Sequence, residues 1–174
     1  ENVSGKSYWD FMSERVFQPL GMTATTNRLP SVIIPNRAAG YEQTNRVWIN
    51  RDSDLTDVFS AGAITSTAGD LAKWNAALDG DRILNAASKE QMWTPAKLND
   101  GKTVKYGFGW HLDTVEGHKN IGHSGTTSGF SASIQRFPDD RLAIIILTNT
   151  DEQIATALAK KIATFFFTKP STPK

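Results

Sequence analysis

The segment with the clearest chemical potential is Gly122-His123-Ser124-Gly125, where a titratable side chain and a hydroxyl lie between two glycines. Glycine lets a ligand lie close to a strand backbone, and histidine can act as acid, base or cation near neutral pH. The N–H of the next residue, Thr126, is available to point at an oxyanion. Taken alone, the four residues fit a partly buried histidine in a glycine-rich hairpin better than they fit a catalytic strand.

The other two histidines offer a weaker chemical alternative. His111 and His118 flank an expected hairpin and could join His123 in a metal site. No carboxylate or histidine recurs at ligand spacing, however, so surface histidines explain the pattern better. We therefore predict no metal site.

Composition excludes several classes of protein. The chain has 174 residues, 39% of them hydrophobic and 21% charged, which is typical of a folded globular domain. The formal net charge is +1 with no dense block of Lys and Arg, so we expect no nucleic-acid partner. The longest apolar run, Leu142 to Leu147, is too short to span a membrane. Without cysteine there is neither a disulfide nor a thiolate nucleophile.

Helical patterns dominate the first hundred residues. Apolar residues at helical spacing follow a Ser7 cap, and Pro19 is expected to stop this helix. Residues 23–60 show no periodicity and are expected to form an irregular wrapping loop. A second helix should run from a Thr67 cap to Gly80. A third, shorter helix is predicted over 86–93, with Asn85 as its cap.

The pattern then changes to that of strands and one closing helix. Strands are predicted over 104–115, 120–123, 129–137 and 142–148. The 129–137 strand alternates like a half-buried strand, and 142–147 is apolar throughout, like a central strand covered on both faces. In the last helix, an apolar stripe is expected to cover the sheet; it comprises Ile154, Leu158, Ile162, Phe165 and Phe166. Helices, then an antiparallel meander, then a helix indicate an α+β fold.

An ordered set of motifs resembles the C-terminal half of the serine β-lactamase-like superfamily, with class C β-lactamases, DD-peptidases and family VIII carboxylesterases as the most similar members. Each motif alone is weak, but their order over residues 3–167 is specific. The motifs are Val16-Phe17-Gln18-Pro19-Leu20-Gly21-Met22, Ser60-Ala61-Gly62 to Trp74, Tyr106-Gly107-Phe108-Gly109-Trp110, Gly122-His123-Ser124-Gly125, Ser128-Gly129-Phe130, Phe137-Pro138-Asp139 and Leu147-Thr148-Asn149.

The resemblance implies roles for the third catalytic motif of that family, here His123-Ser124-Gly125. His123 would give electrostatic help and orient a tyrosine, and the Thr126 N–H would form half of an oxyanion hole. Substrate contacts would come from Ser124, Gly125, Thr127 and Asn149. For Asn149, a cap before the last helix is an equally good explanation.

The family's first two motifs are missing. The only Ser-x-x-Lys is Ser171-Thr172-Pro173-Lys174, whose proline would break the required helix, and no Tyr-x-Asn occurs. In the family both motifs precede the segment matched here. We therefore expect residues 1–168 to be the C-terminal portion of a catalytic domain, mainly helical and looped over 1–100 and sheet plus helix over 101–168, with 169–174 a polar tail.

The resemblance predicts a partial β-lactamase/transpeptidase-like fold without cofactors. The complete protein would be a serine hydrolase acting through an acyl-enzyme on a small-molecule substrate: a β-lactam, a D-Ala-D-Ala peptide or a small ester. This chain alone is expected to be inactive. It should associate with its missing N-terminal half or with itself, because the 142–147 strand would lose a neighbour.

Two alternatives remain. One is a non-catalytic binding or assembly module of the same superfamily, and the other is an unrelated α+β binding domain. The family suggests the bacterial periplasm or cell envelope, while the sequence leaves the cytoplasm open.

Overall fold

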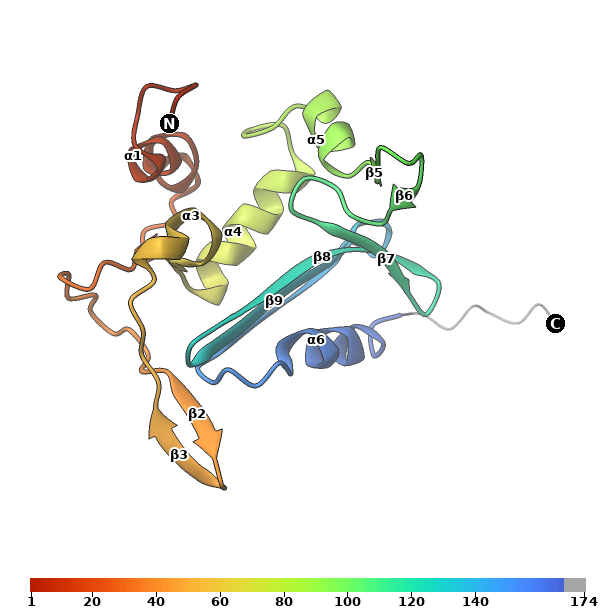
Figure 1. The fold of residues 1–174 in the computed structure, drawn as a ribbon. Coiled ribbons are helices and arrows are strands. Elements are labelled where there is room, and N and C mark those ends of the chain that lie inside the picture. The colour runs from red at the N-terminus through yellow and green to blue at the C-terminus, as the bar shows by residue number, and fades with distance from the viewer. Residues whose placement is uncertain (168–174) are drawn as a thin grey trace.

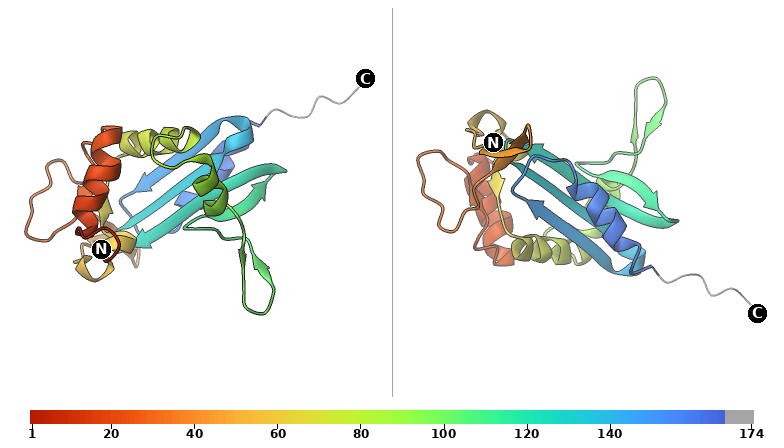
Figure 2. Two further views of the ribbon diagram at one scale, coloured as in Figure 1. Left: turned by 90° about the horizontal axis from the view of Figure 1, so that it is seen from above. Right: turned by 90° about the horizontal axis from the view of Figure 1, so that it is seen from below.

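A four-stranded antiparallel sheet, in the order β10-β9-β8-β7, organises the computed structural model, which describes residues 1–167 (Figure 1). Its strands are β7 (His111–Val115), β8 (His118–Thr127), β9 (Phe130–Phe137) and β10 (Leu142–Thr148). Figure 2 shows α5 over one face of the sheet and α6 over the opposite face. The predicted α+β class is confirmed.

Two of the predicted helices form where their caps indicate. The helix α4 (Ala68–Asp79) begins after Thr67, whose Oγ1 accepts the Asp70 N–H at 3.2 Å. The helix α5 (Ala86–Met92) begins after Asn85, whose Oδ1 accepts the Ser88 N–H at 2.8 Å. Each cap satisfies one of the N–H groups that the first helical turn leaves free. Both helices pack against the sheet through an apolar cluster centred on Leu78, Trp110 and Ile121, with Trp74 and Trp93 beside it.

The first helix forms as predicted from Ser7, but it does not stop at Pro19. It runs through α1 (Tyr8–Met12), a π-helical turn η1 (Ser13–Phe17) and α2 (Gln18–Leu20). The wide turn lets the Gln18 N–H bond to the Ser13 carbonyl, and the proline follows directly in the last turn. The helix ends only at Gly21, whose φ of +65° suits glycine.

Residues 23–60 are more ordered than predicted. They contain β1 (Thr26–Asn27), which pairs with β4 (Ile64–Thr65), then β2 (Tyr41–Thr44), β3 (Val47–Asn50) and η2 (Thr56–Val58), before α3 (Phe59–Gly62). The β2–β3 hairpin projects from the body (Figure 1). Its turn residues Asn45 and Arg46 have φ of 51° and 66°. The hairpin gave no period-two signal because the apolar side chains of β3 are exposed rather than buried on one face.

The prediction of one strand over 104–115 is wrong, because the chain forms two separate strands there. The first, β6 (Thr103–Val104), pairs with the preceding short strand β5 (Ala96–Lys97), and the second, β7, starts only at His111. The intervening chain turns at Gly107, where a Cβ would lie 2.1 Å from the Met92 carbonyl oxygen. Glycine is thus required for the turn to pack on the end of α5.

The closing helix α6 (Ala155–Ala163) covers the sheet with a different face from the predicted one. Ala155, Ala159 and Ala163 are buried, at spacings of four residues. Small side chains let the helix approach β9 and β10 closely. The bulky side chains Ile154, Leu158, Phe165 and Phe166 are instead exposed. We call these four residues the outer face of α6, although only Leu158 lies within the helix and the other three flank it. Ile162, the fifth residue of the predicted stripe, is partly buried.

The sheet differs from prediction in two further respects. The strand β10 lies at an edge of the sheet and is only partly buried, so it is not a central strand in this chain. In β9 the apolar residues are partly buried as predicted, but the polar residues between them are fully buried beneath α6. Among these, Gln135 donates to the Ser133 hydroxyl at 2.9 Å, and that hydroxyl lies 3.3 Å from the hydroxyl of Thr156 in α6.

Candidate functional site

The predicted site strand is longer than expected, and half of it has a free edge. On one side β8 pairs with β9 from Ile121 to Thr127, but on the other side β7 reaches only from His118 to Gly122. Within residues 1–167, no strand pairs with that second side of β8 from His123 onward. Backbone groups at a strand edge are open to pairing with an extended ligand. His123, Ser124, Gly125, Thr126 and Thr127 therefore all lie along one open edge.

The residues of this edge are accessible in the way the prediction requires. Ser124, Gly125 and Thr126 are exposed, and His123 and Thr127 are partly exposed. The space where a Cβ of Gly125 would stand is empty to 4 Å. In contrast, a Cβ at Gly122 would lie 2.3 Å from Oε1 of the buried Gln135. The first glycine of the segment thus serves packing, while the second leaves room beside the edge.

His123 is the centre of an aromatic cluster. Its Nε2 lies 3.0 Å from the hydroxyl oxygen of Tyr106. The ring of His111 stacks on the His123 ring, with centroids 5.4 Å apart and planes 22° apart. Tyr106 and His111 also meet edge to face at 4.8 Å. Three ring side chains therefore surround the start of the free edge.

The surroundings favour a neutral imidazole at His123. Burial lowers the pKa of this histidine, the neighbouring His111 lowers it further, and a backbone hydrogen bond with Ser124 raises it by less. The pKa of His123 therefore lies below its ordinary value. At neutral pH the residue would act as a hydrogen-bonding group rather than as a fixed cation.

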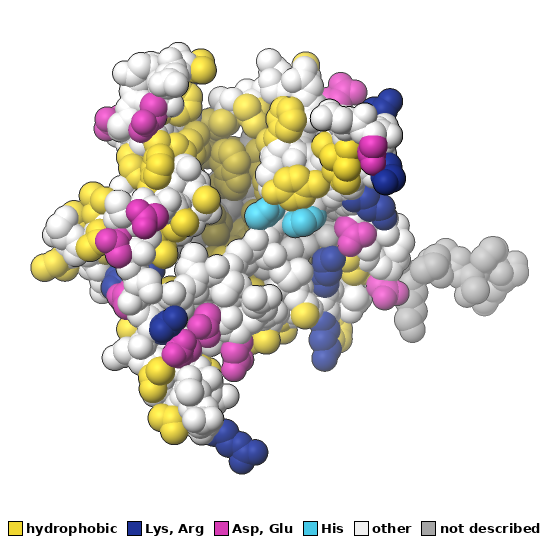
Figure 3. Space-filling view, viewed as in Figure 1, with side chains coloured by type: hydrophobic (Ala, Val, Ile, Leu, Met, Phe, Trp, Pro, Cys, Tyr) yellow, Lys and Arg dark blue, Asp and Glu magenta, His cyan; other side chains and the backbone are white. Residues whose placement is uncertain are grey.

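A cavity of about 290 Å³ opens beside this cluster. His111, His123 and Ser124 line it together with Lys105 and Lys160. The Lys160 ammonium lies 3.3 Å from a carboxylate oxygen of Asp113, which also lines the cavity. Leu112 is the one hydrophobic residue in the lining, so the cavity suits a small molecule with polar or charged groups. Figure 3 also shows histidine side chains next to a hollow with apolar side chains on its walls.

Thr127 and Asn149 lie at the far end of the sheet. Thr127 approaches α3, where its Cγ2 is 3.4 Å from the position of a Cβ on Gly62. The Asn149 side-chain amide donates to the Ala39 backbone carbonyl at 3.0 Å, and the backbone carbonyl of Asn149 accepts the Tyr41 N–H. The capping alternative for Asn149 is wrong, because Ile154 is the N-cap of α6. The residue instead anchors the β2–β3 hairpin to the end of β10.

His118 lies apart from the site. Its Nδ1 is 2.8 Å from Asp140 in the turn after β9, and its ring stacks on Phe167. No group of three or more potential metal ligands forms among residues 1–167. Within the same residues, no helix is long and apolar enough to cross a bilayer.

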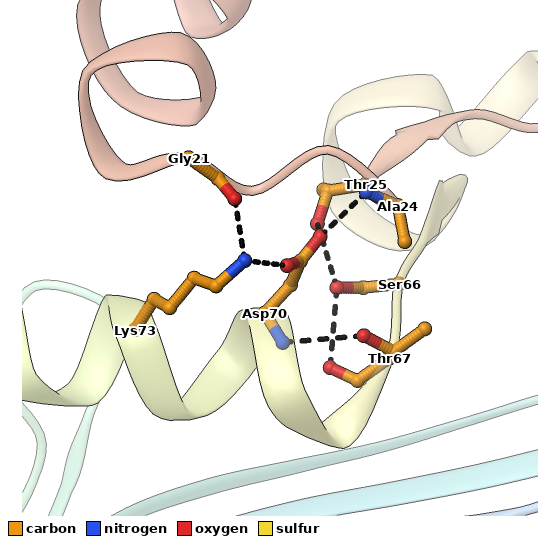
Figure 4. Close-up of polar contacts among 7 residues, drawn as sticks. All are labelled: Gly21, Ala24, Thr25, Ser66, Thr67, Asp70 and Lys73. Carbon is orange, nitrogen blue, oxygen red and sulfur yellow. Dashed lines mark hydrogen bonds and ion pairs between the residues drawn. The ribbon is translucent and has the colours of Figure 1, made fainter.

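A buried carboxylate links two segments of the helical layer (Figure 4). Asp70, 3% exposed, accepts the Ala24 N–H at 2.8 Å, the Thr25 hydroxyl at 2.9 Å and the Lys73 ammonium at 2.8 Å. Thr25 also meets the Ser66 hydroxyl at 2.8 Å. These bonds join the loop after α2 to the start of α4.

Sequence reasoning missed two members of the site, Tyr106 and His111. Tyr106 was visible only as part of the Tyr-Gly-Phe-Gly-Trp motif, and His111 only as a histidine before an expected hairpin. The two come together because Gly107 turns the chain back between β6 and β7, which places Tyr106 against His111 in an isolated bridge. An aromatic residue directly before the first of two glycines, Gly107 and Gly109, was the available signal.

The sheet with helices on both faces, and a His-Ser-Gly segment on its open edge, define a domain like those of penicillin-binding proteins and related serine hydrolases. The Beta-lactamase family profile matches residues 1–166, and the chain belongs to that family. The recognised resemblance is thus confirmed.

Curated relatives agree with this assignment. The chain is 32% identical to penicillin-binding protein 4* of Bacillus subtilis, over 98% of this chain and 41% of that protein. It is 25% identical to the D-aminopeptidase of Brucella canis, over 99% of this chain and 33% of that protein. The chain therefore spans less than half the length of either relative.

Solved structures show the same fold. An octameric penicillin-binding protein homologue from Pyrococcus abyssi superposes with a TM-score of 0.81 and 22% identity, over 94% of this chain and 38% of that chain. A D-stereospecific amidohydrolase from Streptomyces sp. superposes with a TM-score of 0.78 and 24% identity, over 94% of this chain and 49% of that chain.

Proposed function

We propose that residues 1–167 supply the electrostatic and oxyanion side of an acyl-transfer site in a serine hydrolase. The observation that carries the proposal is the free edge of β8 from His123 to Thr127, next to a cavity and an aromatic cluster. An extended amide or ester can pair with such an edge while its carbonyl oxygen meets the Thr126 N–H. His123, held through its contact with Tyr106, would give electrostatic help beside this edge.

The nucleophile of this site would come from residues outside the 174. The sequence has no Tyr-x-Asn, and its one Ser-x-x-Lys, at 171–174, lies outside the described residues. Donors without a nucleophile and its base can bind and polarise a carbonyl but do not accelerate acyl transfer efficiently. We therefore propose that catalysis requires a serine from another segment, and that this chain alone is inactive.

The substrate class we propose is an amide or peptide of a D-amino acid, with β-lactams and small esters as the other candidates. The names of the relatives support it, since they include a D-aminopeptidase and a D-stereospecific amidohydrolase. A neutral His123 also lacks the permanent positive charge that a lysine would offer to a substrate carboxylate. This difference disfavours a dedicated β-lactamase.

Association of this chain with another segment or another copy is part of the proposal. Two features support it. Within residues 1–167, β10 pairs with β9 on one side and with no strand on the other, and the outer face of α6 exposes four large apolar side chains. Exposed apolar side chains and a free strand edge both favour docking. The occupant that agrees best with the missing nucleophile is an N-terminal segment of the same catalytic domain.

The test is a pair of histidine variants of the natural protein that contains these residues. Replacing His123 by alanine should lower kcat/KM for a D-amino acid nitroanilide by about 100-fold or more, as expected for loss of an acid–base or polarising group. The matched control is His118→Ala, which removes the contacts with Asp140 and Phe167, both apart from the site, and should leave kcat/KM unchanged.

Two results would contradict the proposal. If His123→Ala and His118→Ala have equal kcat/KM, His123 has no role in the reaction. Substrate binding without turnover of any of the three substrate classes would instead favour the alternative, a non-catalytic binding module of the same family. The absence of a usable nucleophile motif in these 174 residues is the observation that keeps this second candidate open.

A further inference from the structure

The contact between Tyr106 and His123 brings together two residues that are 17 positions apart. The phenol oxygen lies 3.0 Å from Nε2, and the two ring planes meet at 60° with centroids 6.0 Å apart. The distance is that of an ordinary hydrogen bond, and its direction depends on which ring nitrogen of His123 carries the proton.

The backbone around Tyr106 is fixed by hydrogen bonds to three other segments. The Tyr106 carbonyl accepts the Ala96 N–H at 2.9 Å, and the Gly107 N–H donates to the Trp110 carbonyl at 2.8 Å. The Phe108 N–H donates to the Met92 carbonyl at 2.9 Å. The backbone that carries Tyr106 is thus held independently of His123, and the Tyr106 ring also packs edge to face on His111 at 4.8 Å.

A neutral imidazole has one N–H donor and one acceptor nitrogen, so the partner of each nitrogen sets the tautomer. The backbone of Ser124 raises the pKa of His123, as an oxygen that accepts a proton from the ring would. Because Nε2 faces the Tyr106 hydroxyl, the ring nitrogen that can donate to this backbone is Nδ1. The remaining lone pair is then on Nε2, facing the phenol proton.

We propose that Tyr106 is a positioning residue of this site: its hydroxyl donates to Nε2 of a neutral His123 and so fixes the ring as the Nδ1–H tautomer beside the free edge of β8. The proposal assigns a role to Tyr106 for the reaction and therefore rests on the proposed function. The hydrogen bond itself can be tested without any activity.

The experiment is nitrogen-15 NMR of the histidine rings in the 174-residue chain, for the wild type and Tyr106→Phe. In the wild type, Nε2 of His123 should show the chemical shift of an unprotonated nitrogen. In Tyr106→Phe, the population should move toward the Nε2–H tautomer, which free histidine prefers. Tyr8→Phe, which removes a different partly buried phenol, is the matched control and should leave the His123 shifts unchanged.

A pH titration of the same resonances gives a second readout whose sign depends on the direction of the bond. A hydrogen bond donated to Nε2 stabilises the neutral ring, so its loss in Tyr106→Phe should raise the pKa of His123, by about 0.5 to 1 for an ordinary hydrogen bond. If His123 instead donated to the phenol oxygen, the same variant would lower that pKa. The other charged groups at the adjoining cavity, Lys105, Asp113 and Lys160, are the same in both proteins.

The outcomes separate this inference from the proposed function. A wild-type Nε2–H tautomer, or a pKa that falls in Tyr106→Phe, overturns the positioning role. The wild-type tautomer gives this answer even if the variant does not fold. If the tautomer is as expected but His123→Ala retains full activity in the natural protein, the proposed function fails while the Tyr106–His123 hydrogen bond stands.

Discussion

The buried carboxylate of Asp70 offers the sharpest test of how the helical layer is held. Its two oxygens have different partners: Oδ2 accepts from the Ala24 N–H and the Thr25 hydroxyl, and Oδ1 accepts from the Lys73 ammonium. Asp70→Asn can keep the two neutral donors by placing its amide oxygen at the Oδ2 position. Its NH2 group would then face the Lys73 ammonium, and the charge would be lost. Asp70→Ala removes all three bonds.

The magnitudes follow from what each donor retains. After Asp70→Ala, Lys73 still bonds to the Gly21 carbonyl and Thr25 still meets Ser66, but the Ala24 N–H loses its side-chain partner. A hydrogen bond to a charged group contributes about 1.5–3 kcal/mol, and an exposed ion pair about 0–1 kcal/mol. We expect Asp70→Ala to lower the free energy of unfolding by about 3–4 kcal/mol and Asp70→Asn by about 1–2 kcal/mol.

The pH dependence of stability should distinguish the contribution of the Asp70 charge from that of the Asp70 side-chain shape, which Asp70→Asn retains. Burial raises the pKa of Asp70, but the bonds from Lys73, Ala24 and Thr25 outweigh it and leave the pKa below its ordinary value of 3.8. A lowered pKa means that the carboxylate stabilises the fold fully above about pH 3.8, and that this contribution is lost as the pH falls through the lower folded-state value. The gap between wild type and Asp70→Asn should therefore narrow below that pH.

Urea unfolding followed by circular dichroism, at neutral pH and at two acid values, measures these differences. Lys73→Met removes the ion pair together with the bond to the Gly21 carbonyl, and should lower the free energy of unfolding by less than about 1 kcal/mol because the lysine is half exposed. Equal losses for Asp70→Asn and Asp70→Ala, or a gap that does not change with pH, would show that the network does not act as described.

Other elements give three further predictions. Arg136→Lys should lower the free energy of unfolding by about 2 kcal/mol in urea, because lysine cannot bond both Asn75 and Asp79 as the buried guanidinium does. An unchanged free energy of unfolding would show that these two bonds do not stabilise the fold. Gly122→Ala should lower the free energy of unfolding by about 1–3 kcal/mol, because the new Cβ would meet the Gln135 amide. In a double-mutant cycle, the same substitution made in a Gln135→Ala background should lower it by much less. Leu158→Glu should reduce association in analytical ultracentrifugation with little change in unfolding, as expected for an exposed residue; unchanged association would exclude the outer face of α6 as a docking surface.

Local signals were sufficient for much of the fold. The caps Ser7, Thr67 and Asn85 marked helix starts because each places a side-chain oxygen over free N–H groups, a purely local effect. The strands β8, β9 and β10 followed from turn residues and apolar runs. A strand at His123 was predicted in the same way, but its free edge was not, because it arises where β7 ends its pairing at Gly122.

Packing decided the features that the sequence did not reveal. The apolar stripe of α6 indicated the wrong face because a row of alanines allows closer contact with the sheet than bulky side chains do. The β2–β3 hairpin has exposed apolar side chains, so no alternation marks it. The contacts of Tyr106 and His111 with His123 depend on how the Gly107 turn folds against α5, which no local pattern encodes.

The central claim is that this chain forms one side of an acyl-transfer site whose nucleophile lies elsewhere. The most direct measurement is intact-mass spectrometry of the folded 174-residue chain after incubation with a β-lactam and an activated ester, followed by peptide mapping. We expect no stable acyl adduct on any of its own serines and no turnover. A stoichiometric acyl group on a serine within residues 1–174 would contradict the claim.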